Sequence, residues 1–213
     1  MGKNLTVNPW LKIWLRPRET MREIVSFNPK HRFFILSALY GFPMLLHAAQ
    51  NLSLGKDLPL ATIMIVSLVL AVFIGMAGIS IASFLLLWTG KWIGGRASYY
   101  PIRAAVSWSN VPNVIGIVLW LILVWAFRRE LFLDGFSQTT FVGKELGIVS
   151  SVFILQTVIS IWSLVILVKG LGEVQGFSAW KGLLNVLIPF FLVGIFIWFV
   201  SWVIWACQGM PTG

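Results

Sequence analysis

An uncharged run of 29 residues, from Leu60 to Trp88, is the feature that most limits what this chain can fold into. As an α-helix it would be about 43 Å long, whereas the hydrocarbon core of a bilayer is about 30 Å thick. No soluble domain has a core that could cover such a helix on every side. The run therefore predicts a membrane-spanning helix that is strongly tilted or protrudes at one end.

The composition extends this conclusion to the whole chain. Of the 213 residues, 58% are hydrophobic and 11% are charged, against about 25% charged residues in soluble proteins. The formal net charge of +9 lies between apolar runs, which indicates attraction to anionic lipid headgroups rather than to nucleic acid. The single cysteine, Cys207, excludes an intramolecular disulfide.

Five apolar runs are long enough to be spans, which predicts an all-α, polytopic membrane protein. Their predicted boundaries are 33–51, 60–88, 104–127, 147–168 and 183–206. We expect residues 33–206 to form a five-helix transmembrane domain, followed by a short tail of residues 207–213.

Residues 1–32 are predicted to form a basic amphipathic arm. Apolar residues recur at helical spacing around Trp14 and again around Met21, with basic residues beside them. Arg16 and Pro17 separate the two groups, because proline is disfavoured inside a helix but suits its first turn. The pattern is typical of an interfacial helix lying on the membrane, and a partly disordered basic tail is the alternative.

Small residues line one side of the 60–88 run at steps of four, four, three and four. They are Ser67, Ala71, Gly75, Gly78 and Ala82. Lipid supplies no hydrophobic force between helices, so close approach across small residues drives their association. The ridge predicts packing against another helix of this chain, and a dimer face is the alternative.

Four amide side chains lie inside the last three predicted spans, three of them near a proline. They are Asn110 and Asn113 beside Pro112, Gln156 in the fourth span, and Asn185 ahead of Pro189. We expect both prolines to interrupt their helices. Such amides either satisfy freed carbonyls and pack against neighbouring helices, or line a substrate path as in transporters. A small-molecule or lipid transporter or channel with a site between spans three and five is therefore the alternative function.

Catalytic chemistry has little support in the sequence. All seven acidic residues lie in the arm or in connections, so no span contains the paired carboxylates that an intramembrane hydrolase needs. His47 is alone in its span, and we expect a hydrogen-bonded interface histidine there rather than a proton or metal group. No catalytic residue, metal site or cofactor is expected.

The basic residues are unequally divided between alternate connections. Of 16 Lys and Arg, seven lie in the arm, three in residues 90–103 and two in residues 169–182, while four lie in the other connections. The positive-inside rule places the larger set in the cytoplasm. With five spans, the N-terminus is then cytoplasmic and the C-terminus, with Cys207, lies outside.

Three segments carry patterns beyond hydropathy: NPWLKIWLRPRETMREI in the arm, GGRASYYPIRAAVSWSNVP before the third span, and LGEVQGFSAWKGLLNVLIP before the fifth. They resemble the Yip (Ypt-interacting protein) domain family, specifically its bacterial branch. The resemblance covers nearly the whole chain and implies five spans, a cytoplasmic N-terminus and a bacterial inner or plasma membrane. Eukaryotic relatives engage lipidated Rab-type GTPases in vesicle traffic. A Rab-type GTPase partner is implied here only by that analogy, since the chain has no DLYGP-like segment.

The leading functional prediction is a non-enzymatic membrane protein that organises lipids or partner proteins at the cytoplasmic face. The residues predicted to bind anionic headgroups or a partner are Arg16, Arg18, Arg22, Arg96, Arg103 and Lys181. The partners expected are the bilayer, another membrane protein or a second copy of the chain, and not nucleic acid.

Overall fold

The computed structural model describes residues 8–136 and 139–208, and within them every regular element is a helix. The elements are α1 (Pro9–Leu15), α2 (Pro17–Phe27), α3 (Phe33–Asn51), α4 (Leu60–Trp92), α5 (Tyr99–Trp108), α6 (Asn113–Phe127), the 3-10 helix η1 (Arg128–Phe132), α7 (Gly143–Gln175) and α8 (Ala179–Gln208). Residues 1–7 of the predicted arm and 209–213 of the predicted tail lie outside the described residues.

The prediction of an all-α polytopic membrane protein is confirmed. Among the described residues, α3, α4, α7 and α8 are long and apolar enough to cross a membrane. The bent pair of α5 and α6 makes a fifth span when it is counted as one. Helices α4 and α7 each have 33 residues, so helical structure continues past the apolar runs into the neighbouring connections.

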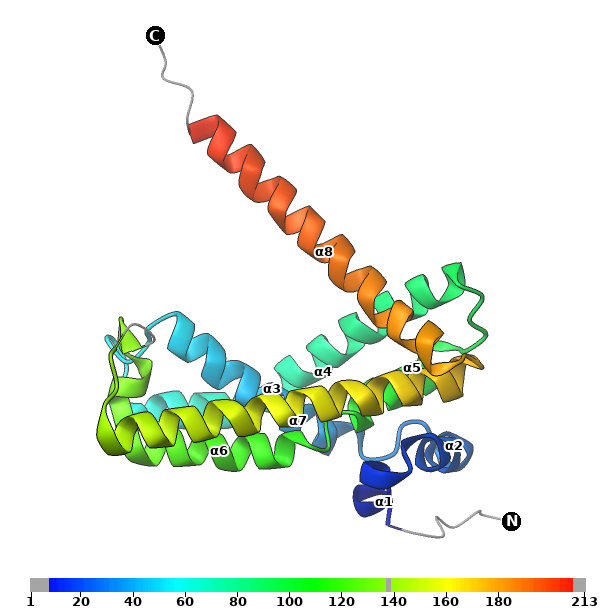
Figure 1. The fold of residues 1–213 in the computed structure, drawn as a ribbon, viewed down its shortest axis with the longest axis horizontal. Coiled ribbons are helices and arrows are strands. Elements are labelled where there is room, and N and C mark those ends of the chain that lie inside the picture. The colour runs from blue at the N-terminus through cyan, green and yellow to red at the C-terminus, as the bar shows by residue number, and fades with distance from the viewer. Residues whose placement is uncertain (1–7, 137–138, 209–213) are drawn as a thin grey trace.

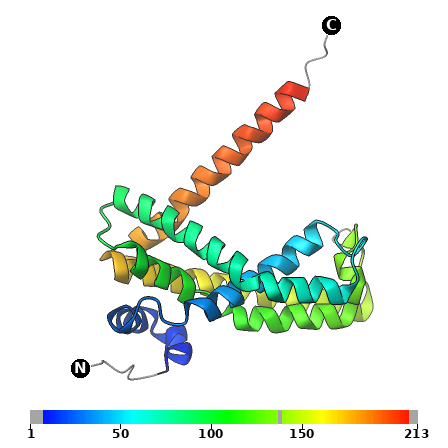
Figure 2. The same cartoon turned by 180° about the vertical axis from the view of Figure 1, so that it is seen from behind.

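The bundle consists of two packed groups, which contact each other through α3 and through the packing of α4 on α5. Helix α3 lies along α4, while α5 and α6 lie along α7, and α3 also contacts both α5 and α6 (Figure 1). Helices α1 and α2 lie beside one end of the bundle, against α5 and α7. Helix α8 begins in contact with α7 and α4 and then runs away from the bundle (Figure 2).

The small residues of α4 lie at its crossing with α3. A side chain on Gly75 would overlap the carbonyl oxygen of Ser37, and one on Gly41 would overlap that of Ala71. The two backbones therefore touch, as packing across glycine allows. Gly78 lies beside the ring of Tyr40 on α3.

The buried side of α4 follows the predicted ridge only in its first half. Ser67, Ala71 and Gly75 are buried, and the series continues at steps of four through Ile79 and Ser83. Gly78 and Ala82 are only partly buried. The buried line on α4 is therefore made of every fourth residue, and it includes large as well as small side chains.

The third predicted span is broken rather than continuous. Helix α5 ends at Trp108, α6 begins at Asn113, and their axes meet at 43°. Ser109 Oγ and Asn110 Nδ2 donate to the carbonyl of Val106 at 2.8 and 2.7 Å, in competition with the helical hydrogen-bond pattern. Pro112 lacks an N–H donor and so removes a helical hydrogen bond. The proline and the two side chains together favour the break.

Helix α8, in contrast, runs through Pro189 without interruption, so the expected break there is wrong. Proline leaves the carbonyl four residues earlier, that of Asn185, without its helical donor. The hydroxyl oxygen of Thr89 on α4 lies 3.4 Å from that carbonyl and 2.8 Å from Asn185 Oδ1. The same hydroxyl also lies 2.9 Å from the carbonyl of Leu85, and its one hydrogen serves a single acceptor at a time, so α4 gives the freed carbonyl a polar neighbour and not a full replacement for the lost donor.

Candidate functional site

The arm is a docked part of the protein. Ile13, Met21 and Ile24 are fully buried in one cluster with Ile102 of α5 and Leu171 of α7. The apolar stripe that was expected to face the membrane therefore packs on the protein itself. Its helical form and the separation of α1 from α2 at Arg16 and Pro17 agree with the prediction.

Charged groups fasten α2 to the turn between α7 and α8. Arg22 Nε donates to Glu173 Oε1 at 2.6 Å, and this hydrogen bond raises the pKa of Arg22. The Arg18 guanidinium donates to the backbone carbonyl of Phe177 at 3.3 Å. Both arginines were predicted to bind lipid or a partner, and the structure places them in contacts within the chain.

Lys12 joins the two arm helices across their bend. Its Nζ lies 2.8 Å from a carboxylate oxygen of Glu19 and 2.7 Å from one of Glu23. The hydrogen bond to Glu19, followed by that to Glu23, raises the pKa of Lys12, and the same bond lowers the pKa of Glu19. Ion pairs within the chain thus hold α1 and α2 together at the bend, without a partner.

Arg103 is held by aromatic rings. Its guanidinium carbon lies 4.1, 5.0 and 5.6 Å from the ring centroids of Phe33, Tyr100 and Tyr99, and its Nε is buried with no hydrogen-bond partner among the described residues. Cation–π attraction to several rings explains why the charge is tolerated here. Arg103 therefore connects α5 to the start of α3.

Gln175 at the end of α7 is a polar residue that sequence reasoning missed. It is buried, and a side chain added to Gly90 or Gly95 would overlap its amide. Its Nε2 lies 3.4 Å from the carbonyl oxygen of Leu86. The spacing of glycines after α4 was the available signal, because glycine permits such close approach.

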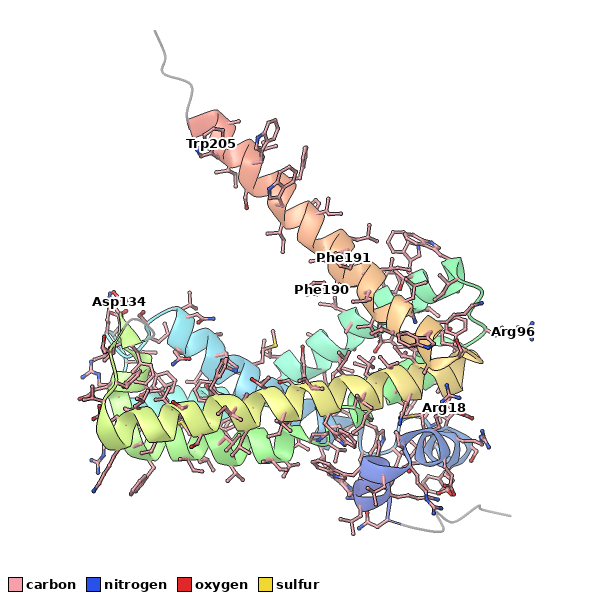
Figure 3. All side chains as sticks on the ribbon, viewed as in Figure 1. Arg18, Arg96, Asp134, Phe190, Phe191 and Trp205 are labelled. Carbon is pink, nitrogen blue, oxygen red and sulfur yellow. The ribbon has the colours of Figure 1, made fainter. Side chains whose placement is uncertain are left out.

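The paired Arg22 has a side chain that is 72% exposed, and the remaining predicted basic residues are exposed as well. Arg16 is near Glu19 at 3.5 Å with its side chain 71% exposed, Arg96 lies in the connection after α4, and Lys181 is in the first turn of α8. Figure 3 shows Arg18 and Arg96 at the same end of the molecule and Asp134 at the other. We call the surface formed by Arg16, Lys91, Arg96, Lys169 and Lys181 the basic end.

The sequence model of the Yip1 domain matches residues 11–201, which include most of the docked arm and the spans. This chain belongs to the Yip1 domain family. No curated protein and no solved structure matches it. Membership in the Yip1 family agrees with the resemblance seen in the arm and the two basic connections.

The four predicted intramembrane amides lie in three separate places of this Yip1 domain. Asn113 Nδ2 donates to Asn110 Oδ1 at 3.0 Å in the break between α5 and α6. Asn185 is fully buried against Thr89 on α4. Gln156 points toward Gly116 on α6, so the structure does not bring the amides of spans three and five together.

Proposed function

We propose that this Yip1-domain protein is non-enzymatic and that its basic end binds anionic lipid headgroups of the cytoplasmic leaflet. The observation that carries the proposal is the exposure of Arg16, Arg96 and Lys181 next to an arm that other charges hold in place. The protein would thereby organise anionic lipids around its spans.

The physical argument separates two uses of basic residues. Three arginines bind within the chain: Arg18 to the carbonyl of Phe177, Arg22 to Glu173, and Arg103 to aromatic rings. We therefore assign them to positioning the arm and α5. Exposed basic groups next to an anionic membrane contribute about 1 kcal/mol each. The basic end is therefore suited to diffuse attraction of headgroups rather than to a single enclosed site.

A comparison of two double variants in mixed nanodiscs tests this proposal. Arg96→Ala with Lys181→Ala removes charge from the basic end, and Arg128→Ala with Lys144→Ala is the matched change among exposed residues of the opposite end. We expect the first pair to lower the preference for phosphatidylglycerol over phosphatidylcholine about tenfold and to weaken its salt dependence. We expect the second pair to leave both unchanged.

An equal lipid preference in the wild type and the first variant would contradict the proposal. If lipid preference stays constant but capture of a membrane protein or a Rab-type GTPase is lost, the basic end is a protein-binding surface instead. The experiment therefore distinguishes the two partners that the sequence suggested.

The orientation of the basic end has its own test. In a Cys207→Ser background, Lys144→Cys reports on one end and Ser178→Cys on the other, and both positions are exposed. An impermeant thiol reagent should label residue 144 in intact cells and residue 178 only in inside-out vesicles. The reverse pattern would place the basic end outside the cytoplasm.

Transport through a site between spans three and five has less support. Asn110 donates to the carbonyl of Val106 and Asn185 Oδ1 lies 2.8 Å from the Thr89 hydroxyl, whereas Asn185 Nδ2 is buried with no partner among the described residues. The main neighbours of α8 are α7 and α4, not the α5–α6 pair. Saturable flux lost on Asn110→Ala and on Asn185→Ala would restore this alternative.

A further inference from the structure

A cavity of about 510 Å³ lies at the end of the bundle opposite the basic end. Helix α3 supplies His47 and Gln50, α6 supplies Trp120 and α7 supplies Val152 and Gln156. Residues after η1, among them Asp134, also line it, at the end of the molecule where Figure 3 labels Asp134. This volume falls within the range of pockets that hold small molecules, about 300 to 1,000 Å³.

Polar side chains face this cavity without partners. In the part of the chain that the structure describes, the side chains of His47, Gln50 and Gln156 make no hydrogen bond to protein, and His47 only contacts the edge of Trp120, with ring centroids 4.6 Å apart. Among the described residues, the histidine expected to be hydrogen-bonded at the interface thus has no partner from the protein itself. His47 is exposed and Gln50 and Gln156 are partly buried, so their donors and acceptors are accessible from the cavity and suit a ligand with hydrogen-bonding atoms.

The charges around the cavity are balanced. The one lining carboxylate, Asp134, is paired with Lys56. Amide groups and a neutral imidazole each donate and accept hydrogen bonds, which suits hydroxyl and carbonyl oxygens. The site thus favours an uncharged head over a phosphate or an ammonium group.

The apolar part of the lining indicates where such a ligand comes from. Trp120, Phe136, Phe141 and Phe153 supply aromatic surface, and Phe153 is 72% exposed on the side of α7 that faces lipid. The cavity therefore borders the bilayer laterally. A tail can lie on the aromatic surface while the head reaches the polar groups inside.

We propose that this cavity binds an uncharged lipid whose head carries hydroxyl or carbonyl oxygens, taken up sideways from the membrane. His47 and Gln156 bind the head, and the aromatic side chains contact the tail. The site is separate from the basic end, so neither proposal depends on the other.

The test uses the full chain in proteoliposomes with a monoacylglycerol that carries a diazirine in its tail. We expect saturable labelling of peptides from α6 and α7, competed by unlabelled monoacylglycerol but not by lysophosphatidylglycerol of the same chain length. His47→Phe combined with Gln156→Leu should raise the half-saturating concentration about tenfold, through the loss of two hydrogen-bonding groups. Thr157→Val, one residue along α7, is the control and should bind as the wild type does.

Thermal unfolding separates binding from a structural effect. Monoacylglycerol should raise the Tm of the wild type and of the control but not of the double variant or of Val152→Phe, which fills the cavity. Without lipid, the double variant should be about as stable as the wild type, because the side chains of His47 and Gln156 make no hydrogen bond within the described residues. Labelling that does not saturate, equal competition by the anionic lipid, or an unchanged lipid effect on the Tm of both variants would overturn the proposal.

Discussion

The two ends of the chain differ in a way that their composition does not suggest. The N-terminal helices α1 and α2 are 7 and 11 residues long and rich in charge, yet Ile13 and Ile24 are fully buried. Helix α8 has 30 residues and is among the most apolar, yet Phe190, Phe191 and Trp205 are exposed as it leaves the bundle (Figure 3). The short charged segment is integrated, and the long apolar one is not.

This contrast shows which force acts at each end. The arm lies at the polar edge of the bundle, where burying an apolar stripe releases water and is favourable. Within lipid, a phenylalanine gains little by moving from acyl chains to protein, so close packing depends on shape. Helices α3 and α4 have glycines where they cross, whereas a side chain added to Gly194 on α8 would meet nothing within 4 Å.

The strongest challenge to the comparison is a matched pair of glycine substitutions. Gly75→Leu forces a side chain into the backbone of α3, so we expect a loss of about 3 kcal/mol or more in the free energy of unfolding. Gly194→Leu enters open space and should change it little. Reversible unfolding in mixed detergent micelles measures both, and equal losses would mean that α8 is packed as tightly as α4.

A second pair compares large apolar side chains. Ile24→Ala leaves a cavity beneath the arm and should cost about 2 to 5 kcal/mol, with faster proteolysis of the arm. Phe196→Ala changes a residue of α8 that is 67% exposed, and little destabilisation is expected. A large effect at Phe196 combined with none at Ile24 would reverse the assignment of packed and unpacked ends.

Thr89 sharpens the comparison at the root of α8, where this helix still contacts the bundle. Thr89→Val removes the hydroxyl next to Asn185, so we expect a loss of about 1 to 2 kcal/mol. Thr157→Val removes a hydroxyl that bonds only within α7, to the carbonyl of Phe153, and should have a smaller effect. Similar values for both would show that the contact between α4 and α8 adds no stability.

The smallest expected effect is a pH dependence of arm docking. Burial, and then the charge of Arg32, lower the pKa of His31, whose ring is stacked on Trp108 with centroids 6.1 Å apart. The pKa of His31 is therefore higher in the unfolded arm than in the docked one. Docking is unaffected above the ordinary pKa of 6.5 and weakens as the pH falls through the lower pKa that His31 has in the folded protein. Proteolysis of the arm should accelerate over that window in the wild type and not in His31→Phe.

Glu19 provides the internal control for this measurement. Its pKa is lowered by Lys12 from an ordinary value of 4.5, so the stability that it contributes is lost only at more acid pH. His31→Phe should retain this second, more acid loss. Loss of both phases in that variant would mean that His31 is not the group responsible for the first.

The sequence determined the features that depend on local chemistry. Hydropathy predicted α3 at the boundaries that the structure shows and predicted the start of α4 at Leu60, because partition into lipid depends on a continuous run of residues. The proline at residue 17 predicted the separation of α1 from α2, because a missing N–H acts on its own helix. The family patterns in the arm and connections were likewise readable without contacts.

The tertiary structure alone decided which face of each helix has a partner. Arg22 is paired with Glu173, 151 residues away, so the sequence did not distinguish it from Arg96, which has no ion pair among the described residues. Helix α8 stays unbroken at Pro189, where Asn185 contacts Thr89, 96 residues away, whereas the third span breaks near Pro112. The cavity beside His47 is likewise lined by residues from three different helices. A span that is apolar on every side carries no periodic signal of orientation, so only contacts between distant residues select the face that packs.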